Sequence, residues 1–145
     1  MMKYLYPCDI KGTEENGEGF VVTFPDINEA ITGGFTFRDS LILAEDCLVV
    51  ALEGYIVLER ELPIPSPYQK GQELLTVQPV IAAQLDLYTA MREQSITVPE
   101  LAKRLGIGEA DAAKLVSLDY CTPIGEVAKA LKAVGCDLAV AERPA

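Results

Sequence analysis

The sequence contains no histidine, and this absence excludes several kinds of site. Histidine is the usual base of hydrolase triads and a common zinc ligand, so most triads and most zinc sites are ruled out. The four cysteines are far apart and form no C-x-x-C pair: Cys8, Cys47, Cys121 and Cys136. We therefore expect reduced, apolar cysteines, with no metal site, no disulfide framework and no cofactor.

Long apolar runs are also missing, and the first residues do not form a secretory signal. Half of the 145 residues are nevertheless hydrophobic, so the chain should bury a core rather than stay disordered. We expect a soluble, cytoplasmic protein with no membrane partner.

Basic residues are scarce in the front half. Residues 1–79 hold 13 acidic and 5 basic residues, a net charge of −8, whereas residues 80–145 hold 9 and 7, a net charge of −2. Such an acidic front half repels nucleic acid and complements a basic protein partner. Ordinary solubility charge is the alternative, and charge alone favours it.

The front half begins with a pattern of short strands. Residues 3–10 predict the first strand, in which Pro7 marks an edge position or a bulge. A turn-rich loop follows over residues 11–18. Residues 19–24, rich in aromatic and β-branched types, predict a second strand that ends at Pro25.

The corner after this strand leads into a long helix. Asp26 and Asn28 are residue types that turn the chain, and residues 30–32 resume an extended run. Gly33 and Gly34 are expected to supply the sharp backbone needed before the helix.

The helix itself is predicted over residues 37–59, with Thr36 and Asp39 as a capping box. One face is apolar at spacings of three and four: Leu41, Ala44, Leu48, Leu52 and Tyr55. A second apolar set widens it: Ile42, Val49, Val50 and Ile56. The second set indicates either thicker packing or a partner surface. Alternate prolines after residue 62 end the helix, and residues 74–80 predict a returning strand, which completes a small α+β unit.

The remainder is predicted to be helical. Residues 82–93 form a helix with buried positions at Leu85, Tyr88 and Met91. Thr97 caps a second helix that stops at Gly106. Residues 109–118 predict a third helix with three inward residues: Ala112, Leu115 and Val116. A fourth starts at residue 122 and ends at Gly135, with inward residues Val127, Leu131 and Val134. Residues 136–140 are a short apolar tail that could pair as a strand between subunits.

Two helices joined by a glycine-containing turn are typical of a helix-turn-helix, although a dimerisation domain that touches no DNA has the same pattern. In the usual docking the second helix contacts the groove. The outward residues expected there are Glu109, Ala110, Ala113, Lys114 and Ser117. Lys103 and Arg104 are expected near the phosphates. Because this half lacks a basic stripe, we expect DNA binding to depend on dimerisation.

Taken together, these segments resemble the HicB antitoxin family over nearly the whole chain. The matching stretches of the front half are residues 19–26, 31–34 and 63–66, with Thr36 opening the helix. The back half resembles the helix-turn-helix of one branch of the family through residues 87–88, 90–91, 100–102, 104–106 and Leu131. At position 34 the family more often has an acidic residue than Gly34.

The resemblance implies two domains. Residues 1–80 would be a partial ribonuclease-H-like β-β-β-α-β unit that binds a toxin, and residues 81–145 an all-α helix-turn-helix domain for DNA binding and dimerisation. The implied function is an antitoxin that inhibits a small basic, HicA-like, RNA-cleaving toxin. It would also repress its own operon by binding operator DNA as an oligomer, a dimer or a tetramer. The acidic residues expected to contact the toxin are Glu14, Glu15, Glu18, Glu29 and Asp39.

Two other functions are compatible with parts of this sequence. A nuclease needs carboxylates converging on metal ions, whereas Asp9, Asp26 and Glu45 are better explained by turns and surface charge. We therefore predict no catalytic residue and no nuclease activity. The other function is a stand-alone helix-turn-helix transcriptional regulator whose front domain senses a ligand or only dimerises. A toxin gene next to the gene for this chain would favour an antitoxin over such a regulator.

Overall fold

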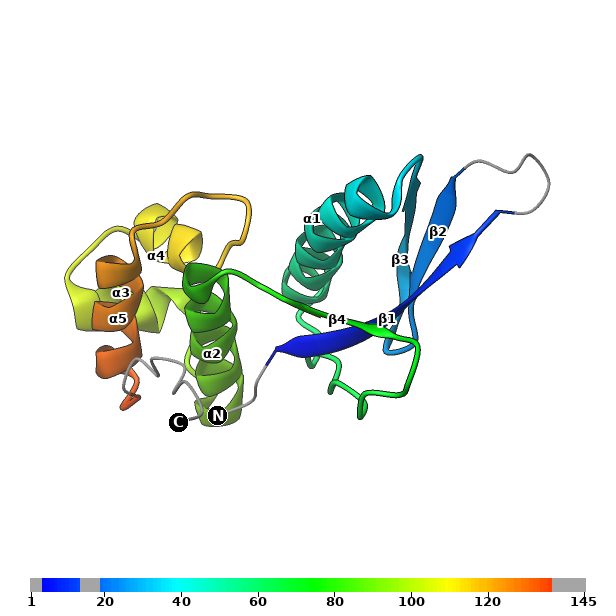
Figure 1. The fold of residues 1–145 in the computed structure, drawn as a ribbon. Coiled ribbons are helices and arrows are strands. Elements are labelled where there is room, and N and C mark those ends of the chain that lie inside the picture. The colour runs from blue at the N-terminus through cyan, green and yellow to red at the C-terminus, as the bar shows by residue number, and fades with distance from the viewer. Residues whose placement is uncertain (1–3, 14–18, 137–145) are drawn as a thin grey trace, which may run out of the picture. The chain divides into compact units, whose positions relative to one another are not determined.

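The computed structural model describes residues 4–13 and 19–136, and the chain divides into two compact units, one of residues 4–77 and one beginning at Gln78 (Figure 1). The first unit contains β1 (Leu5–Gly12), β2 (Phe20–Phe24), β3 (Ile27–Gly34), α1 (Phe37–Val57) and β4 (Glu73–Thr76). The second contains α2 (Pro79–Gln94), α3 (Val98–Leu105), α4 (Glu109–Leu115) and α5 (Ile124–Ala133). The predicted α+β class and the strand–strand–strand–helix–strand order are confirmed.

The four strands form one antiparallel sheet in the order β3-β2-β1-β4. β1 is divided between two partners, because residues 5–8 pair with β4 and residues 9–12 pair with β2. Pro7 lies in the half of β1 whose partner, among the described strands, is β4 alone. A residue without an N–H is tolerated where pairing is one-sided.

The corner between β2 and β3 is tighter than the sequence suggested. Only Pro25 and Asp26 form the turn, and Asn28 already lies in β3. Gly33 also lies in β3 and does not have a left-handed backbone. A Cβ at Gly33 would overlap the carbonyl oxygen of Phe20 on the neighbouring strand. For Gly33 the prediction of a sharp backbone was therefore wrong, because this glycine instead permits close approach of β2.

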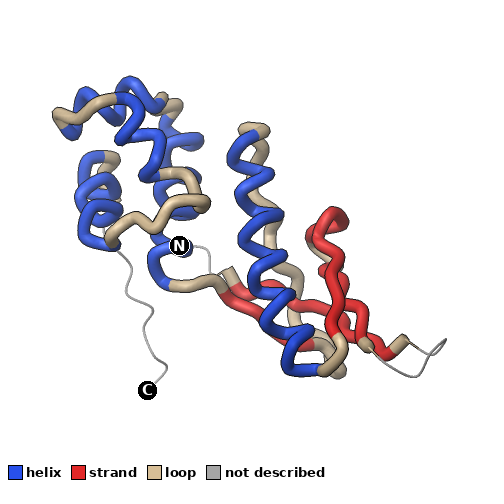
Figure 2. The backbone as a smooth tube through the Cα atoms, turned by 90° about the horizontal axis from the view of Figure 1, so that it is seen from above, coloured by secondary structure: helices blue, strands red, loops and turns tan. Residues whose placement is uncertain are grey.

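Helix α1 packs against β3 (Figure 2). Its capping is as predicted, since the Asp39 N–H donates to Thr36 Oγ1 at 3.0 Å. Most of the predicted buried face is confirmed, but Ser40 is buried in place of Leu41. The Ser40 hydroxyl donates to the Thr36 carbonyl oxygen at 2.8 Å, so its burial leaves no unmade hydrogen bond.

The segment from residue 58 to 72 contains no helix or strand. The Tyr6 hydroxyl donates to the Pro63 carbonyl oxygen at 2.8 Å, which holds this segment against the sheet. The returning strand is shorter than predicted and ends at Thr76, because Pro79 is the first residue of α2. Proline suits this first helical position, where its missing N–H costs nothing.

The second unit packs α2 to α5 around one apolar core, whose centre includes Leu87, Leu101, Val127 and Leu131. The inward residues predicted for three of these helices, all but α3, are buried. Thr97 caps α3, and Gly106 ends it with a left-handed φ of 67°. Residues 137–140 of the predicted subunit-pairing strand lie outside the described residues. Across the described ranges, no helix has the length and hydropathy of a membrane span.

Candidate functional site

The acidic residues predicted to contact a partner do not form one cluster in the described structure. Glu14, Glu15 and Glu18 lie outside the described residues. Glu29 is exposed on β3, and Asp39 is exposed in the first turn of α1. These two carboxylates lie at opposite ends of α1, because Glu29 contacts Tyr55 near the end of that helix.

Glu29 is engaged within its own unit. Tyr55 donates its hydroxyl to Glu29 Oε2 at 3.3 Å, and Arg60 Nη1 lies 3.5 Å from Glu29 Oε1. The Arg60 guanidinium also lies over the Tyr55 ring, 4.4 Å from its centroid. A backbone hydrogen bond at Glu29, together with its two side-chain partners, holds the pKa of this carboxyl below its usual value. Glu29 therefore ties β3 to the chain just after α1.

Asp39 lies at a hollow where β3 ends and α1 begins. The hollow has a volume of about 350 Å³ and is lined by Gly33, Gly34, Phe35, Asp39, Ile42 and Leu43. Its lining is thus mainly apolar, with one carboxylate. Phe35 is 82 % exposed, an unusual position for a large aromatic side chain in a water-facing loop.

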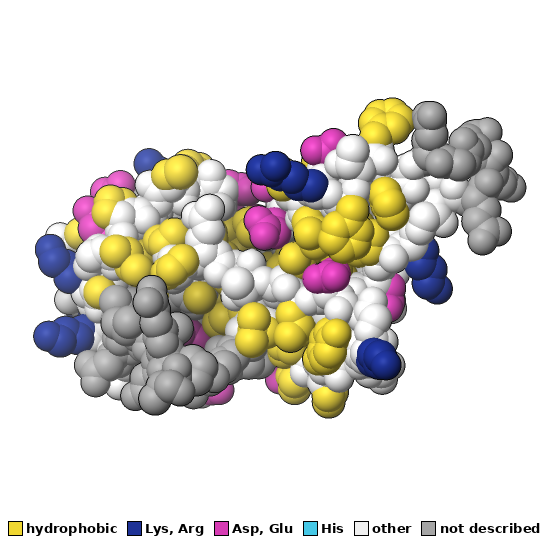
Figure 3. Space-filling model, viewed as in Figure 1, with side chains coloured by type: hydrophobic (Ala, Val, Ile, Leu, Met, Phe, Trp, Pro, Cys, Tyr) yellow, Lys and Arg dark blue, Asp and Glu magenta, His cyan; other side chains and the backbone are white. Residues whose placement is uncertain are grey.

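The exposed side of α1 carries further apolar residues. Of the second apolar set predicted for this helix, Ile42 and Val50 are exposed, while Val49 and Ile56 are partly buried. Figure 3 shows hydrophobic side chains gathered over the first unit, with Asp and Glu side chains beside them. Packing within the unit therefore does not cover Ile42 and Val50, and the partner-surface interpretation stays a prediction.

Of the three carboxylates weighed for nuclease chemistry, Asp9 and Asp26 have partners within the fold, and Glu45 is exposed on α1. Asp26 accepts hydrogen bonds from Ser66, and Asp9 accepts one from Gln72 Nε2 at 3.4 Å. In the part of the chain that the structure describes, no group of three or more potential metal ligands comes together.

The second candidate surface is the helix pair α3–α4. Lys103 and Arg104 are exposed in the last turn of α3. The residues predicted to face outward from α4 are exposed, namely Glu109, Ala110, Ala113 and Lys114, whereas Ser117 is half-buried just beyond the helix. The structure thus places all seven residues on or beside one helix pair.

Two of these cations have contacts within the unit. Arg104 pairs with Glu100 at 3.3 Å and donates to the Ala133 carbonyl oxygen at 3.0 Å, which links α3 to the end of α5. Lys114 Nζ lies 5.5 Å from the centroid of the Tyr120 ring. Arg104 therefore has a structural role that the sequence pattern did not indicate.

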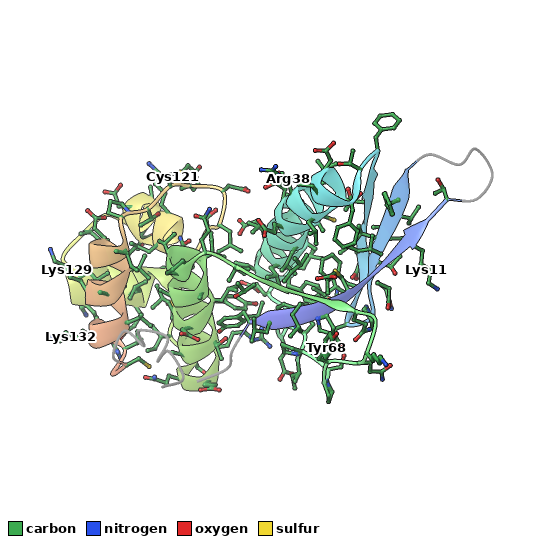
Figure 4. The ribbon with its side chains drawn as sticks, in the orientation of Figure 1. Lys11, Arg38, Tyr68, Cys121, Lys129 and Lys132 are labelled. Atoms are coloured by element: carbon green, nitrogen blue, oxygen red, sulfur yellow. The ribbon has the colours of Figure 1, made fainter. Side chains whose placement is uncertain are left out.

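Sequence reasoning missed two other basic residues of this unit, Lys129 and Lys132. Both are exposed, and Figure 4 shows both on α5. Their spacing of three, next to the buried Ala130 and Leu131, is the signal that places them on one outer face.

Sequence reasoning also missed Gln84, which is fully buried in α2. Its Nε2 donates to the carbonyl oxygens of Leu115 and Ser117, both at 3.0 Å. These carbonyls lie at the end of α4 and just after it, where helix carbonyls lack intrahelical partners. Gln84 therefore holds the end of α4 against α2.

The chain is similar to known proteins across both units. Residues 5–85 match the family model described as "HicB_like antitoxin of bacterial toxin-antitoxin system". "Antitoxin HicB 2" of Photorhabdus laumondii subsp. laumondii is 39% identical over 84% of this chain and 86% of its own length. "Antitoxin HicB 1" of the same organism is 33% identical over 92% and 83%. "Antitoxin HicB" of Escherichia coli (strain K12) is 32% identical over 93% and 96%.

Proposed function

The chain belongs to the HicB-like antitoxin family of bacterial toxin-antitoxin systems, and we propose that it binds and inhibits a small basic, HicA-like toxin that cleaves RNA. The observation that carries this proposal is the similarity to antitoxins over more than four-fifths of the chain. The acidic first part supports it, with a net charge of −8 over residues 1–79. A toxin that cleaves RNA must hold phosphates with Lys and Arg. An acidic protein surface can therefore compete with RNA for the same basic residues of the toxin.

The proposed inhibition is steric, by blocking of the toxin's RNA-binding surface. The antitoxin covers the RNA-binding surface of the toxin and needs no catalytic group of its own. Charge attraction speeds the encounter, and close contact in the complex slows dissociation. Added salt should therefore lower the association rate more than it raises the dissociation rate.

The test is co-expression with the product of the small open reading frame adjacent to this chain's own. We expect the two proteins to co-purify and the complex to lack the RNA cleavage of the free toxin. An adjacent product that neither binds this chain nor loses activity in its presence would contradict the proposal.

We propose in addition that the helix pair α3–α4 binds operator DNA and that the chain represses its own operon as a dimer or tetramer. Exposed Lys103 and Lys114 on this pair, and Lys129 on α5, are available to approach phosphates. Because residues 80–145 carry a net charge of −2, one copy should bind weakly, and two half-sites engaged together would supply the affinity.

Gel shifts with the protein's own promoter region test this second proposal. Lys114→Ala should weaken binding and reduce the slope of log affinity against log salt by about 1 if Lys114 contacts a phosphate. Lys70→Ala in the first unit is the matched control and should leave both unchanged. An absence of wild-type binding at low salt would leave the second unit with a dimerisation role only.

A further inference from the structure

The exposed side of α1 near the hollow has a composition that packing within its own unit does not explain. We propose that this side is the docking face for the basic toxin. The docking face comprises Phe35, Asp39, Ile42, Leu43, Asp46 and Val50. The proposal rests on the proposed function and specifies which surface performs it.

The helical members of the docking face form one continuous stripe. Positions 39, 42, 43, 46 and 50 are spaced by three and four, which places them along one side of α1. All five are exposed. The buried positions 40, 44, 48 and 52 lie on the opposite side, toward the sheet. The stripe therefore points away from the core of its own unit.

Phe35 and the hollow provide the anchor that a protein interface requires. Phe35 is 82 % exposed and lines the hollow together with Ile42 and Leu43. Isolated exposed apolar side chains are ordinary, whereas a contiguous apolar patch beside a concavity marks an interaction site. Aromatic anchors next to such concavities commonly carry most of the binding energy.

The charge of the docking face selects its occupant. Asp39 and Asp46 alternate with the apolar residues, and Arg38, which Figure 4 labels, is exposed in the first turn of α1. In a two-fold dimer through this face, the same acidic patch of each copy would oppose itself, which is unfavourable. A basic partner instead brings Lys or Arg to the two carboxylates. The face therefore fits a basic protein with apolar side chains better than a second copy.

The apolar and the acidic residues of the docking face have separable effects on the rates of toxin binding. Contact with Phe35 and Ile42 removes apolar surface from water and slows dissociation, and this effect persists in high salt. The carboxylates of Asp39 and Asp46 steer the encounter, so their effect is on the association rate and fades with salt.

The experiment compares Phe35→Ala and Ile42→Ala with the control Ile64→Ala, using the product of the adjacent small open reading frame as the probe. Ile64 is 72 % exposed in the segment after α1. It lies between Pro63, which is bonded to Tyr6, and Ser66, which is bonded to Asp26. Asp26 precedes β3, whereas the hollow lies at the far end of that strand. Thermal unfolding checks that all three variants fold as the wild type does.

We expect Phe35→Ala and Ile42→Ala each to weaken toxin binding on the order of tenfold or more, through faster dissociation. Ile64→Ala should bind as the wild type does. Asp39→Asn and Asp46→Asn should slow association at low salt and have little effect at high salt.

Three results would overturn the inference, and they are distinguishable. If the wild-type chain does not bind the probe, the proposed function fails together with the docking face. If the wild type binds and inhibits but folded Phe35→Ala and Ile42→Ala variants do so equally well, only the docking face fails. If these variants reduce the mass of the isolated chain's oligomer without changing toxin affinity, the face binds a second copy instead.

Discussion

The Asp26 carboxylate accepts two hydrogen bonds from Ser66, one from its backbone N–H at 2.9 Å and one from its Oγ at 3.0 Å. The two residues are 40 positions apart, so the contact ties the β2–β3 turn to the segment after α1. Both belong to stretches through which the sequence resembles the HicB family. Those two stretches of the family pattern therefore meet in space and serve the fold.

Asp26→Ala should lower the free energy of unfolding by about 1–3 kcal/mol, because two donors of Ser66 lose their partner. Urea denaturation measures the change, and a double-mutant cycle with Ser66→Ala isolates the shared contribution. Toxin inhibition by the folded variant should equal that of the wild type. Lost inhibition with unchanged stability would instead make Asp26 a contact residue.

Gly33→Ala should destabilise the first unit by about 1–3 kcal/mol, because its Cβ would overlap the Phe20 carbonyl oxygen. Gly54→Ala is the matched control, since a Cβ at Gly54 of α1 meets nothing within 4 Å. Alanine is the better helix former by about 1 kcal/mol, so the control should be stabilised. The two substitutions must have opposite effects on the urea midpoint, and equal effects would refute the close-approach explanation.

Gln84→Leu should loosen the end of α4, because the buried carbonyl oxygen of Leu115 and the partly buried one of Ser117 lose their donor. A loss of about 1–3 kcal/mol in unfolding free energy is expected, with faster amide exchange in α4. Operator affinity should fall if the proposed DNA binding holds, although Gln84 is buried. The control is Gln94→Leu, which removes a hydrogen bond to Val134 beyond α5 and leaves the contacts of α4 in place.

The buried thiol of Cys8 predicts a stability loss at alkaline pH. Burial, with smaller contributions from the charges of Glu73 and Asp9, raises the pKa of Cys8 from 9.0 to about 11. As pH rises from 9.0 to about 11, the unfolded chain loses this proton while the folded chain keeps it. The folded state binds more protons in that window, so its stability falls as pH rises.

Urea midpoints measured from pH 8 to pH 11 test the Cys8 prediction. With Cys8→Ala the urea midpoint should fall less steeply as pH rises. Cys121→Ala, at an exposed position, should leave the fall unchanged. The Tyr6 phenol, whose pKa is also raised mainly by burial, should account for a further decline at the upper end. A wild-type midpoint that is constant across this range would contradict the prediction.

Short-range signals in the sequence predicted much of the fold. Thr36 and Thr97 cap the helices that they were expected to cap, and Gly106 ends α3. Each of these signals depends on hydrogen bonds or backbone angles within one helical turn, so the local sequence contains all the information needed.

Features that depend on long-range contacts were not predicted. The Asp26–Ser66 bond and the close approach at Gly33 join segments that only the folded sheet brings together. Pro79 lies in a run that the sequence predicts as a strand, because this short apolar run has no period that distinguishes a strand from the start of a helix. At the candidate sites, Asp39 as a partner contact stays a prediction, and the hollow beside it has no sequence signal, because a concavity depends on how β3 and α1 pack.

The division of β1 between two partners has a consequence during synthesis of the protein. Leu5, near the start of the chain, pairs with Thr76, so the sheet cannot close until β4 has left the ribosome. A chain interrupted before residue 73 would leave half of its first strand unpaired and open to aggregation or proteolysis. Only a first unit that is complete to Thr76 can form the sheet in which all four strands are paired.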